Sequence, residues 1–514
     1  DWRNILYDAI VVGSGAAGGM AAKCLCDAGV NVLLLEAGDA LPPDAYAQQD
    51  RSVQQFSDLQ MRQPVQSQGL QYNKGNCHLF TDDLDNPYTN TANTSFNWIR
   101  SRLAGGRTAV WSRFAARMSA NDFNGEAEFD DGPAWPLLYE DLSPYYDKVE
   151  TLIGVTGTPE GLLSMPDGRF SPRPSPSYLL SMREQLERRY PGRHLIPARQ
   201  VGIGNHADDL NAPPIYTSTG STLLQCDPSK LTFRTNCVVA RIDIDRPNHA
   251  KGVVFIDQKT KRSYEVSARV VILCASTIES TRILLASTTT SYPTGLANSS
   301  GLLGHYLMDH FGGCRAMAVG RIKGMEQRHH EQACIPCFDD LHTQPQSFAG
   351  GYSMQMDLRA EGNGNVILTL AVFGEVLSSF ENAVTLDESV QDSCGLSVPR
   401  IHFAYGDNER HMALHAQNSV REIVEALDFK LMIAHDETLP GGTRAHELGM
   451  VRMGATPADS VLNEYNQCWD INNLFVTDGA CFPSAGNVGP TLTIMALTAR
   501  ACDYIVSQLR AGNL

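Results

Sequence analysis

The sequence has no apolar run that approaches the roughly 18 residues of a membrane span, and it has no excess of basic residues. Lys and Arg number 41 against 57 Asp and Glu, which gives a formal net charge of −16. This sign makes nucleic acid and anionic membranes poor partners and favours a small neutral or cationic ligand. No signal-peptide pattern precedes the first predicted strand, so we expect a cytoplasmic protein, although the start at Asp1 leaves a removed leader open.

The sequence also lacks the pattern of a disulfide framework. Its 13 cysteines are odd in number and mostly scattered, which is typical of reduced core thiols. The one CxxC motif, Cys334 to Cys337, has no second pair, and we interpret it as two ordinary loop thiols rather than a zinc or redox centre. There is no CxxCH haem motif, so no metal is predicted and any onward electron carrier must be a separate molecule.

The N-terminal sequence has the pattern of a dinucleotide-binding βαβ unit. A strand at 9–12 leads into Gly13-Ser14-Gly15-Ala16-Ala17-Gly18, a helix is expected over about 16–28, and Glu36 closes a strand at 32–35. Such glycines let the backbone approach a pyrophosphate, whose charge the helix N-terminus favours. A carboxylate about 20 residues later suits a ribose hydroxyl and disfavours NADP. The glycines alone are compatible with a plain tight turn, but the whole unit predicts a bound dinucleotide.

Later strand-to-helix junctions are expected to meet the same nucleotide. Strands are predicted at 231–234, 238–244 and 252–256, forming a meander, and at 269–274, entering a helix near Ser276. Near the C-terminus, a strand at 473–477 precedes Asp478-Gly479, and Pro490-Thr491 opens the last helix. One turn between the N-terminal unit and these strands contains Gly105, Gly106 and Trp111. Such a turn suits a backbone that lies flat on a ring system, and the alternative is a tight turn with a packing tryptophan.

In this order the segments resemble the GMC (glucose-methanol-choline) flavoprotein oxidoreductases over nearly the whole chain, and in particular the glucoside 3-dehydrogenase and pyranose oxidase branch. The matching residues are 12–19, Gly105-Gly106-Arg107-Thr108, Trp135-Pro136, 141–146, Tyr306-Leu307-Met308-Asp309-His310, His446-Glu447-Leu448-Gly449 and Asp478-Gly479-Ala480-Cys481-Phe482-Pro483. The resemblance implies FAD as the dinucleotide. Pyranose oxidases can carry a flavin-linked histidine just before the tryptophan; Val110 stands here, so noncovalent FAD is expected.

The resemblance and the length, too great for one core, imply an α/β fold, α+β overall, with a Rossmann-like FAD-binding domain. We expect this domain from residues 1–154 (with covering loops at 39–95), 231–304 and 446–514. Residues 155–230 are expected to form an excursion or lid, and 305–445 the body of a discontinuous, sheet-based substrate domain. The predicted FAD-binding residues are Gly13, Gly15, Ala16, Ala17, Gly18, Glu36, Arg102, Gly105, Gly106, Thr108, Val110, Trp111, Val238, Val239, Cys274, Ala275, Asp478, Gly479, Pro490 and Thr491.

His446 is the predicted catalytic base, because hydride transfer from an alcohol to flavin N5 requires a group that takes the hydroxyl proton. It matches the histidine of the family's His-x-x-Gly motif, and the alternative is a structural histidine. His310 is interpreted as an architectural link near the ring, and His305, His329 and His330 as surface or packing residues.

Residue 489 departs from the resemblance. The family usually has Asn or His there, hydrogen-bonded to the substrate oxygen, whereas this chain has Gly489. Loss of such a donor can cost about 10²-fold in rate. We hypothesise that the flexible loop brings in the amide of Asn487 as a replacement, the second predicted catalytic residue.

The predicted function is FAD-dependent oxidation of a secondary alcohol of a sugar or glycoside, at pyranose C3 or C2, to a ketone. The electron acceptor is O2 or a separate redox carrier. The alternatives are a flavin-retaining lyase that performs non-redox acid–base chemistry on the same fold, and a non-catalytic flavoprotein.

Overall fold

Two large sheets organise the computed structural model, which describes residues 5–46, 49–124, 134–202, 216–325, 330–336, 338, 348–361 and 363–514. The helices are α1 (Ala16–Asp27), α2 (Val53–Arg62), α3 (Ala120–Asn124), α4 (Tyr139–Ile153), α5 (Ser177–Arg189), α6 (Thr277–Ala286), α7 (Asp407–Ala426) and α8 (Thr491–Ala511). The strands are β1 (Tyr7–Val12), β2 (Val32–Leu35), β3 (Thr89–Asn90), β4 (Val155–Gly157), β5 (Ser171–Pro172), β6 (Ile196–Pro197), β7 (Gln200–Val201), β8 (Leu231–Arg234), β9 (Cys237–Arg246), β10 (His249–Asp257), β11 (Ser263–Leu273), β12 (Phe311–Gly320), β13 (His330–Ile335), β14 (Tyr352–Ala360), β15 (Val366–Gly374), β16 (Ala383–Gln391), β17 (Ser397–His402), β18 (Lys430–His435) and β19 (Leu474–Val476). The predicted mixed α/β class is confirmed.

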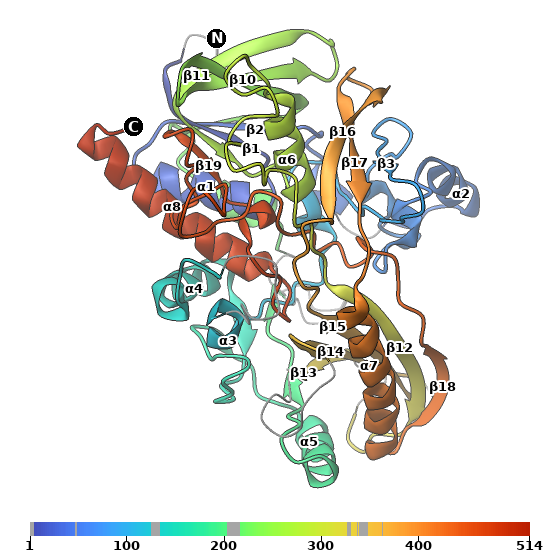
Figure 1. Ribbon diagram of the computed structural model, residues 1–514. Helices are drawn as coiled ribbons and strands as arrows, with labels where there is room; N and C mark the ends of the chain where they lie inside the picture. The colour runs from blue at the N-terminus through green and yellow to red at the C-terminus, as the bar shows by residue number, and fades with distance from the viewer. Residues whose placement is uncertain are drawn as a thin grey trace.

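The first sheet, in the upper half of Figure 1, has a parallel core. Its described strands follow the order β8-β2-β1-β11-β10-β9, and β19 pairs with β11. β1 and β2 are almost continuous apolar runs, as expected for parallel strands buried on both faces. The register aligns Val12 with Leu35 and Leu273, and Leu273 with Val476. Four strands therefore end at one edge, and the loops that follow them meet there.

The meander was predicted correctly in part. β9, β10 and β11 are antiparallel neighbours. However, the strand predicted at 231–234 does not belong to the meander: β8 runs parallel to β2, with Leu231 opposite Val32. The prediction was wrong because an alternating pattern identifies a strand but does not specify its partner, which depends on long-range packing.

The second sheet is antiparallel and occupies the lower half of Figure 1. Its described strands follow the order β18-β12-β15-β14-β13-β6. Residues alternate along β15, so that Val366, Leu368, Leu370 and Val372 are buried in the core shared with α7, whereas Phe373 points to the opposite face. β6 comes from the segment predicted as an excursion, and pairs with β13.

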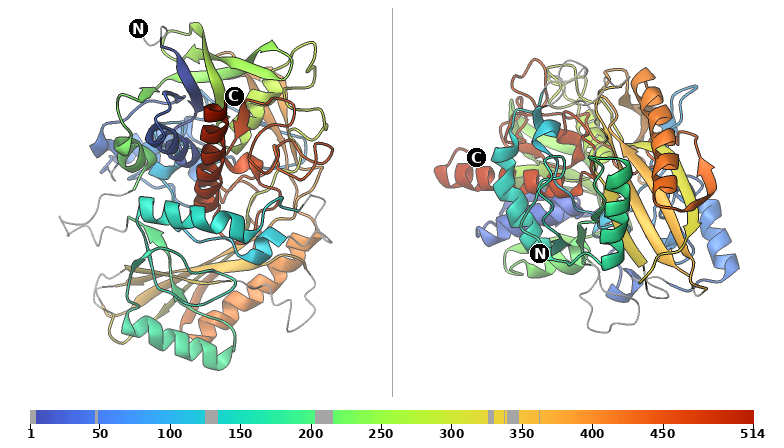
Figure 2. Two further views of the ribbon diagram at one scale, coloured as in Figure 1. Left: turned by 90° about the vertical axis from the view of Figure 1, so that its left-hand side faces the viewer. Right: turned by 90° about the horizontal axis from the view of Figure 1, so that it is seen from below.

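Two small sheets and α4 connect the halves. β16, β17 and β3 form one small sheet, and β5, β4 and β7 form the other. The left view of Figure 2 shows α4 between the two large sheets, next to α8. Tyr146 of α4 donates or accepts a hydrogen bond with Thr493 of α8 at 2.8 Å, so the last helix is tied to this connection.

None of the helices in the described ranges is both long and apolar enough to cross a membrane. Every cysteine among the described residues is a free thiol, and Cys334 lies buried in β13. Its CxxC neighbour Cys337 falls outside the described residues, as does His329.

Candidate active site

An elongated cavity with an empty volume of about 2050 Å³, partly open to solvent, runs along the strand ends of the first sheet and reaches the second sheet. Nineteen of the predicted site residues line it: Gly13, Gly15, Ala16, Ala17, Glu36, Arg102, Gly106, Thr108, Val110, Trp111, Val238, Val239, Cys274, Ala275, His446, Asp478, Gly479, Pro490 and Thr491. Three others, Gly18, Gly105 and Asn487, are not part of the lining. Segments from both ends of the chain thus share one cavity.

The glycines after β1 have two different roles. A Cβ placed on Gly18 would lie 1.8 Å from the Gly13 carbonyl oxygen, so Gly18 is required for packing of α1 against the preceding turn. A Cβ on Gly15 would meet no protein atom within 4 Å, because it would project into open space. Gly15 therefore leaves room for a ligand beside the start of α1.

Glu36 is held rigidly at the end of β2. One carboxylate oxygen accepts hydrogen bonds from the Ser14 backbone N–H (3.0 Å) and hydroxyl (2.7 Å), and the other accepts one from the Gly38 N–H (2.8 Å). A carboxylate has about four acceptor positions, so one remains for a hydroxyl group of a ligand. This geometry is compatible with the predicted contact to ribose.

Residues 105–111 cross the cavity next to the glycine turn. Gly105 and Gly106 have positive φ angles of 91° and 53°, and the Gly105 N–H donates to the Ser14 hydroxyl at 2.9 Å. The Thr108 hydroxyl donates to the Gly105 carbonyl at 2.6 Å and accepts from the Ser218 N–H at 2.9 Å. Gly105 thus holds this segment against the glycine turn without lining the cavity, whereas Gly106, Arg107 and Thr108 form part of the cavity surface.

The C-terminal wall consists of Asp478 and the start of α8. The Asp478 carboxylate accepts hydrogen bonds from the Ser280 hydroxyl and the Ala480 N–H. Burial raises the pKa of Asp478 to about 6. At the start of α6, Ser276 has a φ of 83°, a conformation that favours glycine, so the backbone keeps that form without a glycine.

Among the described residues, the cavity wall has polar groups without protein partners that are suited to FAD. Buried atoms without a partner in the described residues include Ser101 Oγ, Arg102 Nε and Trp111 Nε1, all on residues of the cavity wall. Neither α1 nor α8 has a side-chain cap, since Gly15 and Pro490 precede their first turns. Uncapped N-terminal N–H groups and a guanidinium are suitable partners for pyrophosphate and flavin oxygens.

His446 stands at the end of the cavity near the second sheet. Its ring Nδ1 lies 3.2 Å from Nδ1 of His310, and the two rings are almost perpendicular at 86°. A Cβ on Gly489 would lie 3.9 Å from His446 Nε2. Nε2 therefore faces the cavity position where the family resemblance places a second polar side chain.

The surroundings keep His446 neutral. Burial lowers its pKa well below 6.5, and His310, Arg107 and Arg444 add to this. Burial likewise lowers the pKa of His310 to about 4. Asp309 accepts the His446 backbone N–H, and its pKa is raised to about 7 by burial and by the nearby Glu447.

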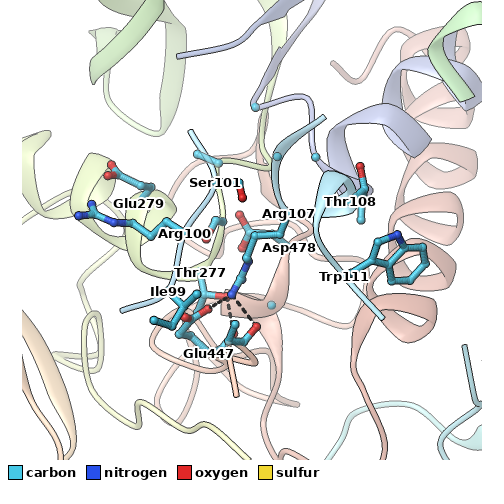
Figure 3. Close-up of a pocket in the computed structure, with 18 of the residues that line it drawn as sticks. Ile99, Arg100, Ser101, Arg107, Thr108, Trp111, Thr277, Glu279, Glu447 and Asp478 are labelled. Carbon is cyan, nitrogen blue, oxygen red and sulfur yellow. Dashed lines mark hydrogen bonds and ion pairs between the residues drawn. The ribbon is translucent and has the colours of Figure 1, made fainter. Parts of the chain in front are cut away.

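Arg107 clamps the segment that carries His446. Figure 3 shows its side chain reaching Glu447, with which it forms an ion pair at 2.6 Å, and it also donates to the Ala445 carbonyl at 2.5 Å. The Glu447 side chain is fully buried. Residues on both sides of His446 are thus fixed to the turn at 105–111, a link that the sequence analysis missed although both motifs had been identified.

The other histidines and Asn487 occupy different places. His310, interpreted as an architectural link, is fully buried and contacts His446 directly. His305 is half-buried and stacks on Phe380 at 3.8 Å, and His330 is exposed on β13. Asn487 is buried, with its carbonyl accepting from Ser353, and the structure does not bring it to the cavity wall.

Comparison with known proteins agrees with this architecture. Residues 378–498 match the family model described as GMC oxidoreductase. The chain is 28% identical over 547 aligned residues to 2-methyl-1,2-propanediol dehydrogenase of Mycolicibacterium austroafricanum, which covers 97% of this chain and 95% of the relative. It is also 26% identical to C-glycoside 3-oxidase of Arthrobacter globiformis, over 52% of this chain and 51% of the relative.

A solved structure shows the same fold over the whole chain. Pyridoxine 4-oxidase from Mesorbium loti superposes with a TM-score of 0.63 at 18% identity, covering 97% of this chain and 99% of that chain. The family model, the relatives along the full length and the cavity built from both chain ends are consistent with one another. The chain thus has a GMC oxidoreductase C-terminal domain and resembles GMC flavoenzymes along its length, and it is an FAD-binding enzyme of the class that oxidises alcohol groups.

Proposed function

We propose that this protein oxidises a secondary alcohol of a sugar or glycoside, at pyranose C3 or C2, to a ketone, with His446 as the general base. The observation that carries the proposal is the orientation of His446: Nδ1 contacts His310 and Nε2 faces the cavity. FAD, when bound, supplies a two-electron acceptor for the hydride of the alcohol carbon. The protein must then remove the hydroxyl proton and hold the substrate.

The contact between the two histidines constrains the tautomer of the base. Two Nδ1 atoms at 3.2 Å share one proton, because one of them must donate and the other accept. If His446 donates, its Nε2 has a free lone pair toward the cavity and can take a proton. His310 then acts as the acceptor that orients the base, in the manner of a third group in a catalytic relay.

The depressed pKa of His446 supports the same role. A base must be unprotonated before it reacts, and burial together with the neighbouring positive groups favours the neutral imidazole. As the alcohol becomes a carbonyl, the imidazole becomes charged. His446 therefore starts the reaction in the neutral form that can accept the hydroxyl proton.

The absence of a side chain at Gly489 leaves space next to Nε2. A Cβ there would be 3.7 Å from His446 Cε1, which is ordinary contact distance, so the gap lies at the base itself. The amide of Asn487 stays a prediction as a replacement donor, and its place behind the wall gives it no support. We propose that a substrate group fills this gap.

FAD is proposed to bind without a covalent link. Val110 lines the cavity beside Trp111, and its side chain has no nucleophilic atom that could attach to a flavin. Denaturation followed by filtration tests this, since noncovalent flavin leaves the protein and covalent flavin stays with it.

The substrate class is supported by relatives named C-glycoside 3-oxidase and pyranose 2-oxidase. The comparisons lend no support to the lyase alternative. The decisive experiment is an anaerobic screen of monosaccharides, glycosides and simple secondary alcohols, read by bleaching of the flavin absorbance. Ketone formation at C2 or C3 with bleaching supports the proposal. Product formation without bleaching of the flavin identifies a lyase. If no alcohol bleaches the flavin or gives a product, the proposed function is refuted. Reoxidation by O2 or by an added carrier then identifies the acceptor.

A further inference from the structure

A buried arginine lies on the cavity face of the second sheet. Strand alternation directs Gln355 of β14 and Phe373 of β15 to this face, and both line the cavity. Gly312 of β12 pairs with Phe373 and leaves a space that Arg444 fills, because a Cβ on Gly312 would lie 2.9 Å from Arg444 Nε. The guanidinium carbon lies 4.1 Å from the centroid of the Phe373 ring. The sheet thus provides a flat support for this guanidinium.

Arg444 has no carboxylate partner in the described part of the chain. It is 6% exposed, its Nη2 donates to the Val372 carbonyl, and its Nε has no acceptor. Two other buried arginines do have one: Arg117 pairs with Glu150 and Arg199 with Asp167. Burial and the nearby positive charge of Arg315 lower the pKa of Arg444 to about 10, so it remains a cation at neutral pH. Asp309 acts on this cation only from beyond ion-pair distance, and a buried cation without a direct ion pair is costly unless a ligand supplies the charge.

The position of this cation relates it to the base. The guanidinium and the His446 ring both lie within 6 Å of the Phe373 ring, at 4.1 Å and 5.9 Å. One sugar unit can therefore contact both groups. Gln355 is a second donor on the same face, since its amide forms no hydrogen bond among the described residues and lines the cavity.

We propose that Arg444, with Gln355 beside it, binds a carboxylate of the substrate, so that the sugar oxidised by His446 is a sugar acid such as a uronate or its glycoside. The planar guanidinium matches a carboxylate in a bidentate arrangement. This inference rests on the proposed function and specifies its substrate. The overall charge of −16 favours neutral or cationic ligands at long range, but the unpaired charge at this end of the cavity has the opposite sign.

The test compares two substrates that differ only in the carboxylate. The flavin-loaded protein is mixed anaerobically with a methyl hexopyranoside or with the methyl uronoside that has a carboxylate at C6, and flavin reduction is followed. We expect kcat/KM to be at least about 10-fold higher for the uronoside, as for a gained charged hydrogen bond. Arg444→Met should lower it by about 10²-fold for the uronoside and by less than about threefold for the neutral glycoside. Arg444→Lys should fall between wild type and Arg444→Met, because it keeps the charge and loses the fork.

Arg359→Gln is the matched control. Arg359 is exposed on β14, so this substitution removes one positive charge at a position away from the cavity. Flavin content and Tm establish whether each variant is folded. If Arg444→Met is not folded, the comparison of the two substrates is made with Arg444→Lys. Calorimetric titration of the oxidised protein with the uronoside gives a Kd, which should rise in Arg444→Met. Equal rates for both substrates in wild type, or an equal loss for both in Arg444→Met, overturn the inference and leave the proposed function standing. If neither substrate nor any other alcohol reduces the flavin, the proposed function itself fails.

Discussion

Replacement of His446 by alanine is the most direct test of the mechanism. The substitution removes the imidazole whose Nε2 faces the cavity, while the residues that line the FAD portion lie on other segments. Arg107 contacts the backbone carbonyl of Ala445 and the side chain of Glu447, so the substitution at residue 446 leaves both contacts in place. We therefore expect a folded protein with bound FAD and an impaired reaction.

The magnitude follows from the lost interactions. A positioned general base typically contributes about 10²- to 10⁴-fold, which corresponds to about 3 to 5 kcal/mol of barrier. The side chain also gives up the contact with His310 and packing near Phe373, and one neutral hydrogen bond is worth about 1 kcal/mol of stability. That cost is small beside a typical folding stability of about 5 to 15 kcal/mol, so the rate should fall far more than the stability.

The assay is anaerobic stopped-flow reduction of the bound flavin by the best substrate of the screen. The variant should be at least about 10²-fold slower, and added imidazole should restore part of the rate by occupying the space of the missing ring. His305→Ala is the control, because His305 is half-buried and stacked on Phe380 outside the cavity lining. Reduction of His446→Ala at the wild-type rate, with FAD bound, would refute the assignment of the base.

Three further predictions test the site. The rate of flavin reduction should be independent of pH above 6.5 and should fall only at lower pH. The reason is that the lowered pKa keeps His446 unprotonated until the pH falls to that pKa. A loss of rate that already begins above pH 6.5 as the pH is lowered contradicts this reasoning. His310→Phe should retain FAD and reduce it about 10-fold more slowly, since the base loses its Nδ1 partner, and an unchanged rate would show that His310 only fills space. The Gly15→Val variant should fold but fail to retain FAD, because the valine side chain enters the open cavity. The Gly18→Ala variant should not accumulate as folded protein, since the added Cβ meets the Gly13 carbonyl. Titration with FAD and thermal melting distinguish the two outcomes.

The sequence predicted those parts of the protein that depend on local pattern. The strand, glycine turn, helix and Glu36 of the N-terminal unit were recognised because the glycines, the apolar runs and the acid lie within one short segment. The family resemblance combined distant motifs into a site, and all but three of the predicted site residues, Gly18, Gly105 and Asn487, line one cavity. The strand at 231–234 was recognised as a strand, but its parallel pairing with β2 was not, because many registers satisfy the same alternation.

The amino-acid sequence by itself determined the mixed fold and the dinucleotide turn, since both follow from residue type and spacing along the chain. The choice of His446 as the candidate base came from the resemblance to the family's His-x-x-Gly motif. Only the tertiary structure decided that His310 contacts His446, that Arg107 fixes the residues around it, and that Arg444 lies beside Phe373 with no ion-pair partner among the described residues. These partners are separated by long stretches of chain, and no local pattern records which side chains the folded sheets bring together. Their charges and tautomers depend on burial, which exists only after the chain has folded.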